Sequence, residues 1–137
     1  MLFVEWLHNC QCFVILFLKD EMLRQQFVIS PSLFIQFNSL LKIKLWRPFP
    51  FDDLKKAVKG IKILAVTDRA CSFGGPGGPV CSEIRSALYD MPSRPKIVNY
   101  LIGLGGRDVQ VENFIDMVRR AAKGKLSERY EFYGVRG

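Results

Sequence analysis

The chain has 137 residues, of which 49% are hydrophobic and 24% are charged, and its net charge is +7. This length argues against several domains but allows a core large enough for independent folding. The basic residues are spread through the expected helices and are not grouped with aromatic residues, which argues against a nucleic-acid-binding surface.

The chain contains four cysteines, Cys10, Cys12, Cys71 and Cys81. They fall short of the dense disulfide framework of a small secreted protein, and we find no signal peptide with a basic start and a small-residue cleavage site. We therefore expect a reducing, cytoplasmic setting.

The composition changes sharply near residue 39. All eleven glycines lie at or after Gly60 and the first alanine is Ala57, whereas six of the eleven phenylalanines lie in the first 37 residues. We therefore expect a boundary between an N-terminal segment, residues 1–39, and a domain formed by residues 40–137. No single secondary structure is indicated for the N-terminal segment.

The longest apolar run of the N-terminal segment does not predict a membrane span. It covers residues 12–18, far short of the roughly 20 residues that a transmembrane helix needs. Association of residues 1–37 with a membrane surface stays open as an alternative.

The domain begins with an expected strand, helix and strand. Residues 40–45, "LLKIKL", alternate as a strand does, and "WRPFP" turns the chain. Residues 51–60, "FDDLKKAVKG", predict a helix with Asp52 and Asp53 at its positive end and Gly60 as its stop. Residues 61–67, "IKILAVT", are apolar enough for a strand covered on both faces.

A second helix, a third strand and a third helix follow. Pro79 suits a first helical turn, and the apolar residues Val80, Ile84, Ala87 and Leu88 recur at helical spacing. Residues 96–102 predict a strand, and the third helix has an apolar stripe formed by Val111, Phe114, Ile115, Val118 and Ala122. This alternation predicts an α/β fold, a small parallel sheet flanked by helices with right-handed crossovers.

The loops after the strands are the candidate functional segments, because ligands and partners approach open parallel sheets at the carboxyl ends of their strands. These loops are "WRPFP", "DRACSFGGPGGP" and "GLGGRDV". Together with the start of the second helix they supply our candidate docking residues, which are Arg47, Asp68, Arg69, Ser72, Gly74, Gly75, Gly77, Gly78, Glu83, Gly103, Gly105, Gly106, Arg107 and Asp108.

Neither glycine loop completes a phosphate-binding motif. A P-loop needs Gly-Lys-Ser/Thr at its end, but Pro79 follows Gly78 here, so the lysine is missing and one N–H donor is lost. "GLGGRD" starts as a dinucleotide fingerprint does, but Asp108 stands where the third glycine is required. Partial glycine motifs are usually tight turns, and binding of an anionic nucleotide stays an alternative.

Two dipeptides of aspartate and arginine, Asp68-Arg69 and Arg107-Asp108, lie at corresponding strand ends. Each arginine could bind a carboxylate or phosphate through two hydrogen bonds. The alternative, which we prefer, is that these residues pair with each other or with the neighbouring loop and form a structural network. Glu83 is explained by its favourable interaction with the dipole of the second helix.

No catalytic residue or metal site is predicted. The only histidine is His8, and neither Cys71 nor Ser72 has a base that the sequence makes visible. "HNCQC", residues 8–12, offers three ligating side chains but no fourth ligand at a zinc-site spacing, and the spacing of iron–sulfur ligands is absent.

Residues 40–137 resemble the C-terminal part of the α chain of pyruvate:ferredoxin oxidoreductase or of a sibling 2-oxoacid:ferredoxin oxidoreductase. The likeness rests on "LLKIKLWRPFP", "GIKILAVTDRACSFGGPGGPVCSEIRSALY", "KIVNYLIGLGGRDVQVENF" and "YEFYGVRG", in that order. It implies a fold similar to the transketolase C-terminal domain, in agreement with the periodicity. Residues 1–39 show no such likeness.

The resemblance implies a role in the oxidative decarboxylation of a 2-oxoacid to an acyl-CoA with reduction of ferredoxin. Such an enzyme uses thiamine diphosphate, magnesium and iron–sulfur clusters, which other domains or subunits hold, so we expect none to be bound by this chain alone. Its expected partners are the other subunits of the complex and, through them, ferredoxin and CoA. The sequence does not indicate which 2-oxoacid is used.

Two departures from the family pattern lead to further expectations. About forty unmatched residues stand where the family has a large preceding domain, so we expect a truncated or decayed reading frame, inactive alone. Gln110 stands where the third helix prefers Ser or Thr as its cap, so Asp108 is expected to cap instead. The alternative to a subunit fragment is an independent module that binds a nucleotide or a CoA-like anion.

Overall fold

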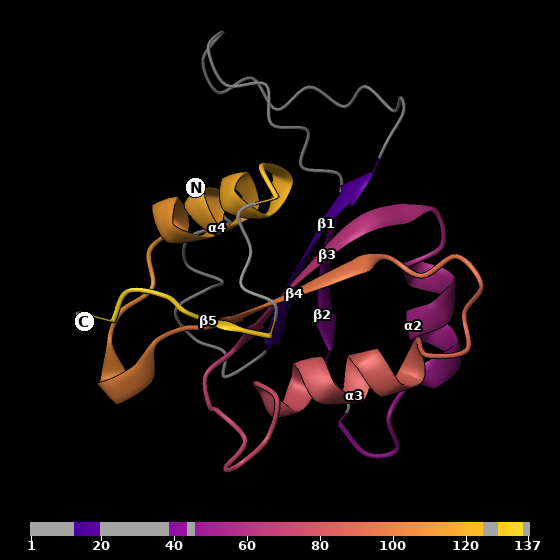
Figure 1. Ribbon diagram of the computed structural model, residues 1–137, viewed down its shortest axis with the longest axis horizontal. Coiled ribbons are helices and arrows are strands. Elements are labelled where there is room, and N and C mark those ends of the chain that lie inside the picture. Colours follow the sequence, from indigo (N-terminus) through magenta and orange to yellow (C-terminus); the bar gives the residue numbers. More distant parts are fainter. Residues whose placement is uncertain (1–12, 20–38, 44–45, 125–128, 136–137) are drawn as a thin grey trace, which may run out of the picture.

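The computed structural model describes residues 13–19, 39–43, 46–124 and 129–135. In chain order the elements are β1 (Phe13–Lys19), β2 (Ser39–Ile43), α2 (Phe51–Ala57), β3 (Ile61–Asp68), α3 (Pro79–Ala87), β4 (Lys96–Leu101), the short 3-10 helix η1 (Leu104–Gly106), α4 (Val111–Ala122) and β5 (Glu131–Phe132). The strands form one sheet in the order β2-β1-β3-β4-β5 (Figure 1).

The predicted α/β fold is confirmed. β3, β4 and β5 are parallel neighbours, and β4 follows β3 through the crossover helix α3. β1 is an addition that the sequence did not predict: it lies between β2 and β3 and runs antiparallel to both. The N-terminal segment, for which no single structure was indicated, therefore contributes a strand to the interior of the sheet.

Helices cover both faces of the sheet, because alternate residues of a strand point to opposite sides. Leu64 and Val66 of β3 belong to a core with buried residues of α2 and α3, whereas Ala65 belongs to a second core with Met117 and Val118 of α4. Figure 1 shows α4 on one side of the sheet and α2 and α3 on the other. The described part of the molecule thus has three layers, with the sheet in the middle.

Two helices differ in detail from the expectation. α2 ends at Ala57, before the expected stop at Gly60, and the N–H of Val58 closes its last turn on the Leu54 carbonyl at 3.0 Å. In α4 the stripe was wrong at Ala122, which is exposed, and the buried residues are Met117, Val118 and Ala121.

The start of α4 corrects the expectation that Asp108 caps the helix. Gln110 occupies the N-cap position. Its backbone N–H donates to the Asn113 side chain at 2.8 Å. Gln110 and Asn113 thus form a capping box at the start of α4.

Candidate docking edge of the sheet

The segments after four strands lie along one edge of the sheet. β2, β3, β4 and β5 all run in the same direction, because β2 and β3 are both antiparallel to β1 and β3, β4 and β5 are parallel. We call the segments that follow them, residues 46–50, 69–78, 103–110 and 133–135, the loop edge. It contains every candidate docking residue except Asp68, at the end of β3, and Glu83, in α3.

Asp68 is buried beneath the loop edge and binds the start of α3. Its carboxylate accepts hydrogen bonds from the backbone N–H groups of Val80 at 2.9 Å and Cys81 at 3.3 Å. It also accepts a bond of 2.9 Å from the side-chain amide of Asn99 in β4. Asp68 therefore does not pair with Arg69 at the surface, which was one form of the network that we preferred. It caps α3 and joins that helix to β3 and β4.

Burial and hydrogen bonding act on Asp68 in opposite directions. Burial raises the pKa of this carboxyl, and the bonds from Val80, Asn99 and Cys81 oppose that rise. All three partners are donors, so an ionised carboxylate satisfies them best, and the positive end of the helix dipole adds to this preference. The negative charge of Asp68 is thus stabilised by hydrogen-bond donors of the same chain.

Gly77 and Gly78 are required because the backbone packs directly on this buried pair. A Cβ added to Gly78 would lie 2.0 Å from Cγ of Asp68, and one added to Gly77 would lie 2.6 Å from Oδ1 of Asn99. The N–H of Gly78 donates to that same Asn99 oxygen at 2.9 Å. Any side chain at these positions would push the loop off the strands.

This packing decides what the start of α3 can bind. An anion site at a helix start needs free N–H groups. Here the N–H groups of Gly78, Val80 and Cys81 are engaged by Asn99 and Asp68, and Pro79 has none. A phosphate would have to displace a buried carboxylate, so the geometry speaks against nucleotide binding at this helix.

The glycine loop is closed by its own backbone and exposes one aromatic side chain. Ser72 donates from its N–H to the Gly77 carbonyl at 2.8 Å, and Gly75 donates to the Ser72 carbonyl at 3.0 Å. Gly74 has φ +67°, a value that L side chains rarely adopt. Phe73, between these residues, is fully exposed.

Arg69 and Arg107 each reach a neighbouring loop. The Arg69 guanidinium lies against Gly103, where an added Cβ would be 3.1 Å from its Nε. Arg107 donates to the Gly134 carbonyl. For these arginines the structure therefore shows contact with the adjacent loop rather than pairing within each Asp–Arg dipeptide.

Arg47 and Glu83 connect the "WRPFP" turn to α3. Their side chains form an ion pair, and the Arg47 guanidinium also lies 4.8 Å from the centre of the Trp46 ring. The explanation of Glu83 by the helix dipole was wrong, because the first turn of α3 has no acidic residue and Glu83 lies beyond it. The pair is half-exposed, so its contribution to stability is small.

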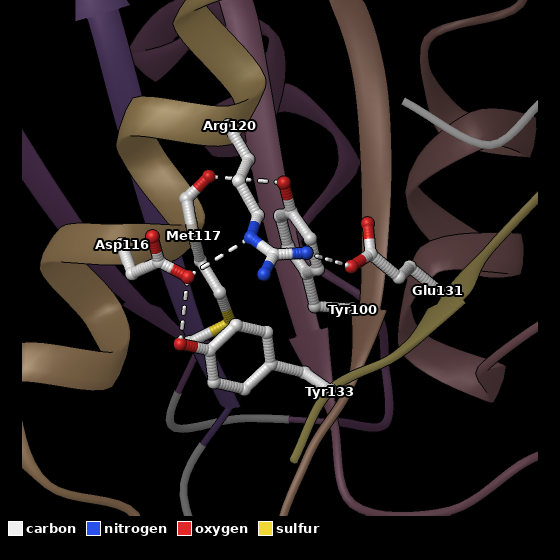
Figure 2. A network of polar contacts seen from close by, with 6 residues as sticks. All are labelled: Tyr100, Asp116, Met117, Arg120, Glu131 and Tyr133. Carbon is white, nitrogen blue, oxygen red and sulfur yellow. Dashed lines mark hydrogen bonds and ion pairs between the residues drawn. The ribbon is translucent and has the colours of Figure 1, made fainter. Parts of the chain in front are cut away.

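A polar network that the sequence did not predict joins α4 to residues 131–133 (Figure 2). Arg120 bonds to Asp116 at 2.9 Å and to Glu131 at 2.7 Å, and Asp116 also accepts from the Tyr133 hydroxyl at 2.9 Å. The buried Tyr100 of β4 donates to the Met117 carbonyl at 2.9 Å. Two sequence signals pointed toward it: the i,i+4 spacing of Asp116 and Arg120 on the expected third helix, and "YEFYGVRG", for which no element was expected.

β5 and the residues after it border a hollow next to this network. It is lined by Asn113, Arg120, Glu131, Phe132, Tyr133, Gly134 and Val135. Phe132 and Val135 are exposed. Three of the lining residues, Tyr133, Gly134 and Val135, belong to the loop edge, and the Gly134 carbonyl accepts the hydrogen bond from Arg107.

The described residues hold neither a metal-binding cluster nor a membrane-spanning helix. Among them, no group of three or more His, Cys, Asp or Glu side chains could bind a metal ion. No helix in the described part of the chain is long and apolar enough to cross a membrane. Cys71 and Cys81 are free thiols, and burial raises the pKa of Cys81 to about 12. The expectations about His8, Cys10 and Cys12 lie outside the described residues.

The fold and the loop edge thus define a small α/β domain whose strand-end loops are fixed by its own side chains. A comparison with protein families assigns it more narrowly. The chain belongs to the pyruvate:ferredoxin oxidoreductase core domain II family, whose model matches residues 39–114.

Curated relatives agree with this assignment. The "Pyruvate synthase subunit PorA" of Thermotoga maritima is 38% identical over 97 residues, which are 70% of this chain and 24% of that protein. The "Ketoisovalerate oxidoreductase subunit VorA" of Pyrococcus abyssi is 37% identical over 99 residues, 69% of this chain and 25% of the relative. PorA of Methanosarcina barkeri is 33% identical over 100 residues, again 25% of its length. The chain therefore spans about a quarter of the length of these relatives.

Proposed function

We propose that this chain is part of the α subunit of a 2-oxoacid:ferredoxin oxidoreductase and contributes to the oxidative decarboxylation of a 2-oxoacid through assembly rather than chemistry. The proposal is supported by the family match and by relatives that are named as oxidoreductase subunits. The relatives' names cover pyruvate and ketoisovalerate, so they leave the 2-oxoacid open.

The observation that carries the assembly role is that side chains of the same chain engage the backbone donors where the glycine loop enters α3. The donors at the start of α3 are engaged by Asp68 and Asn99, which argues against the alternative of an anion site at this helix. What the edge offers outward is shape: a closed glycine loop that presents Phe73, and two exposed arginines, Arg69 and Arg107. Such a surface suits contact with another polypeptide.

The described residues do not provide a complete site for the cofactors of the parent enzyme. The backbone donors at the start of α3 are engaged by Asp68 and Asn99, and no group of three or more His, Cys, Asp or Glu side chains that could bind a metal occurs in the described part of the chain. In the proposed complex, thiamine diphosphate, magnesium and the iron–sulfur clusters are therefore bound by other parts of the assembly. CoA and ferredoxin likewise meet the complex and not this domain alone.

Co-expression with the remaining subunits of a pyruvate synthase tests the proposal. We expect the chain to co-elute with them in size-exclusion chromatography and Arg69→Ala and Arg107→Ala to weaken co-elution. Arg94→Ala is the matched control, because Arg94 is exposed but lies just before β4, at the opposite edge of the sheet. Unchanged assembly in both loop-edge variants would refute the docking role.

A thermal melt of the chain with CoA or ATP tests the independent module. A ligand that binds the folded state raises the melting temperature with its concentration. We expect no such rise. A concentration-dependent rise would support the module and contradict a purely assembling role.

A further inference from the structure

The family-matched part of the chain, residues 39–114, lacks the interior strand of its own sheet, β1, besides the short edge strand β5. The match begins at residue 39, the first residue of β2, so β1 lies outside it. Yet β2 and β3, which both lie within the match, are not neighbours, because β1 stands between them. Residues 39–114 therefore fold around a space one strand wide, which a segment from outside the match fills.

The contacts of β1 show how this space binds its occupant. On one side Phe13 to Phe17 pair with Ile43 to Ser39 of β2, and on the other Ile15 to Lys19 pair with Val66 to Ile61 of β3. Without β1, two facing rows of backbone N–H and C=O groups would lack partners. Edges of this kind bind extended segments through main-chain hydrogen bonds, and side chains supply selectivity.

We propose that the space between β2 and β3 is a strand-binding site, occupied here by β1 as an internal ligand and able to accept an equivalent strand of another polypeptide. Its occupant is an extended apolar segment of about seven residues that runs antiparallel to β2 and β3, as "FVILFLK" does. The source that we assign to such a strand is the remainder of an α subunit, since the aligned residues make up only 24% of the PorA relative from Thermotoga maritima. This inference goes beyond the proposed function, because it does not involve the loop edge.

A peptide exchange on the full chain tests the site. Leu16 pairs with Leu40 on one side and Ala65 on the other, and proline at this position removes a ladder donor from the middle of the sheet. We expect Leu16→Pro to lower the melting temperature measured by circular dichroism. A peptide with the sequence of β1, flanked by two lysines at each end for solubility, should raise it again with increasing concentration and bind one to one in native mass spectrometry.

Two controls distinguish binding at the space between β2 and β3 from nonspecific association of the peptide with the chain. The same peptide with proline in place of its central leucine should neither bind nor stabilise, and the unmodified chain, whose site is filled, should not respond. Leu16→Gly is a milder variant for the case that Leu16→Pro does not fold. Unchanged stability in both variants, or a loss in both that the peptide does not reverse, overturns the proposal. The peptide exchange uses no partner subunit, so its outcome is independent of the co-elution test of the docking role.

Discussion

Replacement of Asp68 by asparagine tests whether this carboxylate joins β3, β4 and α3. The side chain keeps its shape but loses its charge, and its new amide group faces N–H donors where the carboxylate accepted them. A buried hydrogen bond to a charged group contributes about 1.5–3 kcal/mol, so we expect Asp68→Asn to lower the unfolding free energy by about 3 kcal/mol. Asp68→Ala, which leaves three donors unpaired, should cost about 3–5 kcal/mol.

Urea denaturation of the full chain measures this effect. The midpoint should fall while the dependence of the free energy on urea stays constant, because the surface exposed on unfolding is unchanged. The control is Asp108→Asn at the exposed loop edge, where we expect a change within about 0.5 kcal/mol. If Asp68→Asn unfolds at the same midpoint as Asp108→Asn, the carboxylate does not cap α3 and the account of the glycine loop is wrong.

Three further predictions use other buried groups. Gly78→Ala should lower the unfolding free energy by about 2 kcal/mol or more, because its Cβ would meet the carboxylate beneath the loop; an unchanged urea midpoint would contradict the close packing. Cys71 should react with iodoacetamide in the folded chain and the buried Cys81 only after unfolding, as peptide mass spectrometry can measure; equal rates would contradict the burial. Stability should fall as pH rises from about 10 to 12, because burial raises the pKa of Tyr100 to about 12 and the unfolded state loses its proton first; an equal fall in Tyr100→Phe would show another cause.

The sequence predicted the part of the fold that depends on local patterns. α3 is preceded by glycine and begins with proline, and its apolar residues recur at helical spacing, so its bounds could be recognised. β3 and β4 are apolar runs of strand length between turn residues. In each case the information lies within about ten neighbouring residues, which is the range in which periodicity and capping act.

The missed features depend on contacts between distant residues. β1 is an uninterrupted apolar run, and such a run has no period that separates strand from helix or fixes its partners. Asp68 looked like half of a surface Asp–Arg dipeptide, and only its approach to Asn99, 31 residues later, shows that it is a buried cap. Glu83 likewise finds Arg47 across 36 residues. Candidate residues could be named from the sequence, but their partners could not.

The union of β3, β4 and α3 through one carboxylate affects how the glycine loop meets a partner. Because Asn99 binds Gly78 at the end of the loop, and the N–H of Ser72 binds the Gly77 carbonyl within it, much of the conformational entropy of ordering the loop is lost when the chain folds. In the docking that we propose for this loop, association restricts few further torsions and should proceed as rigid-body docking.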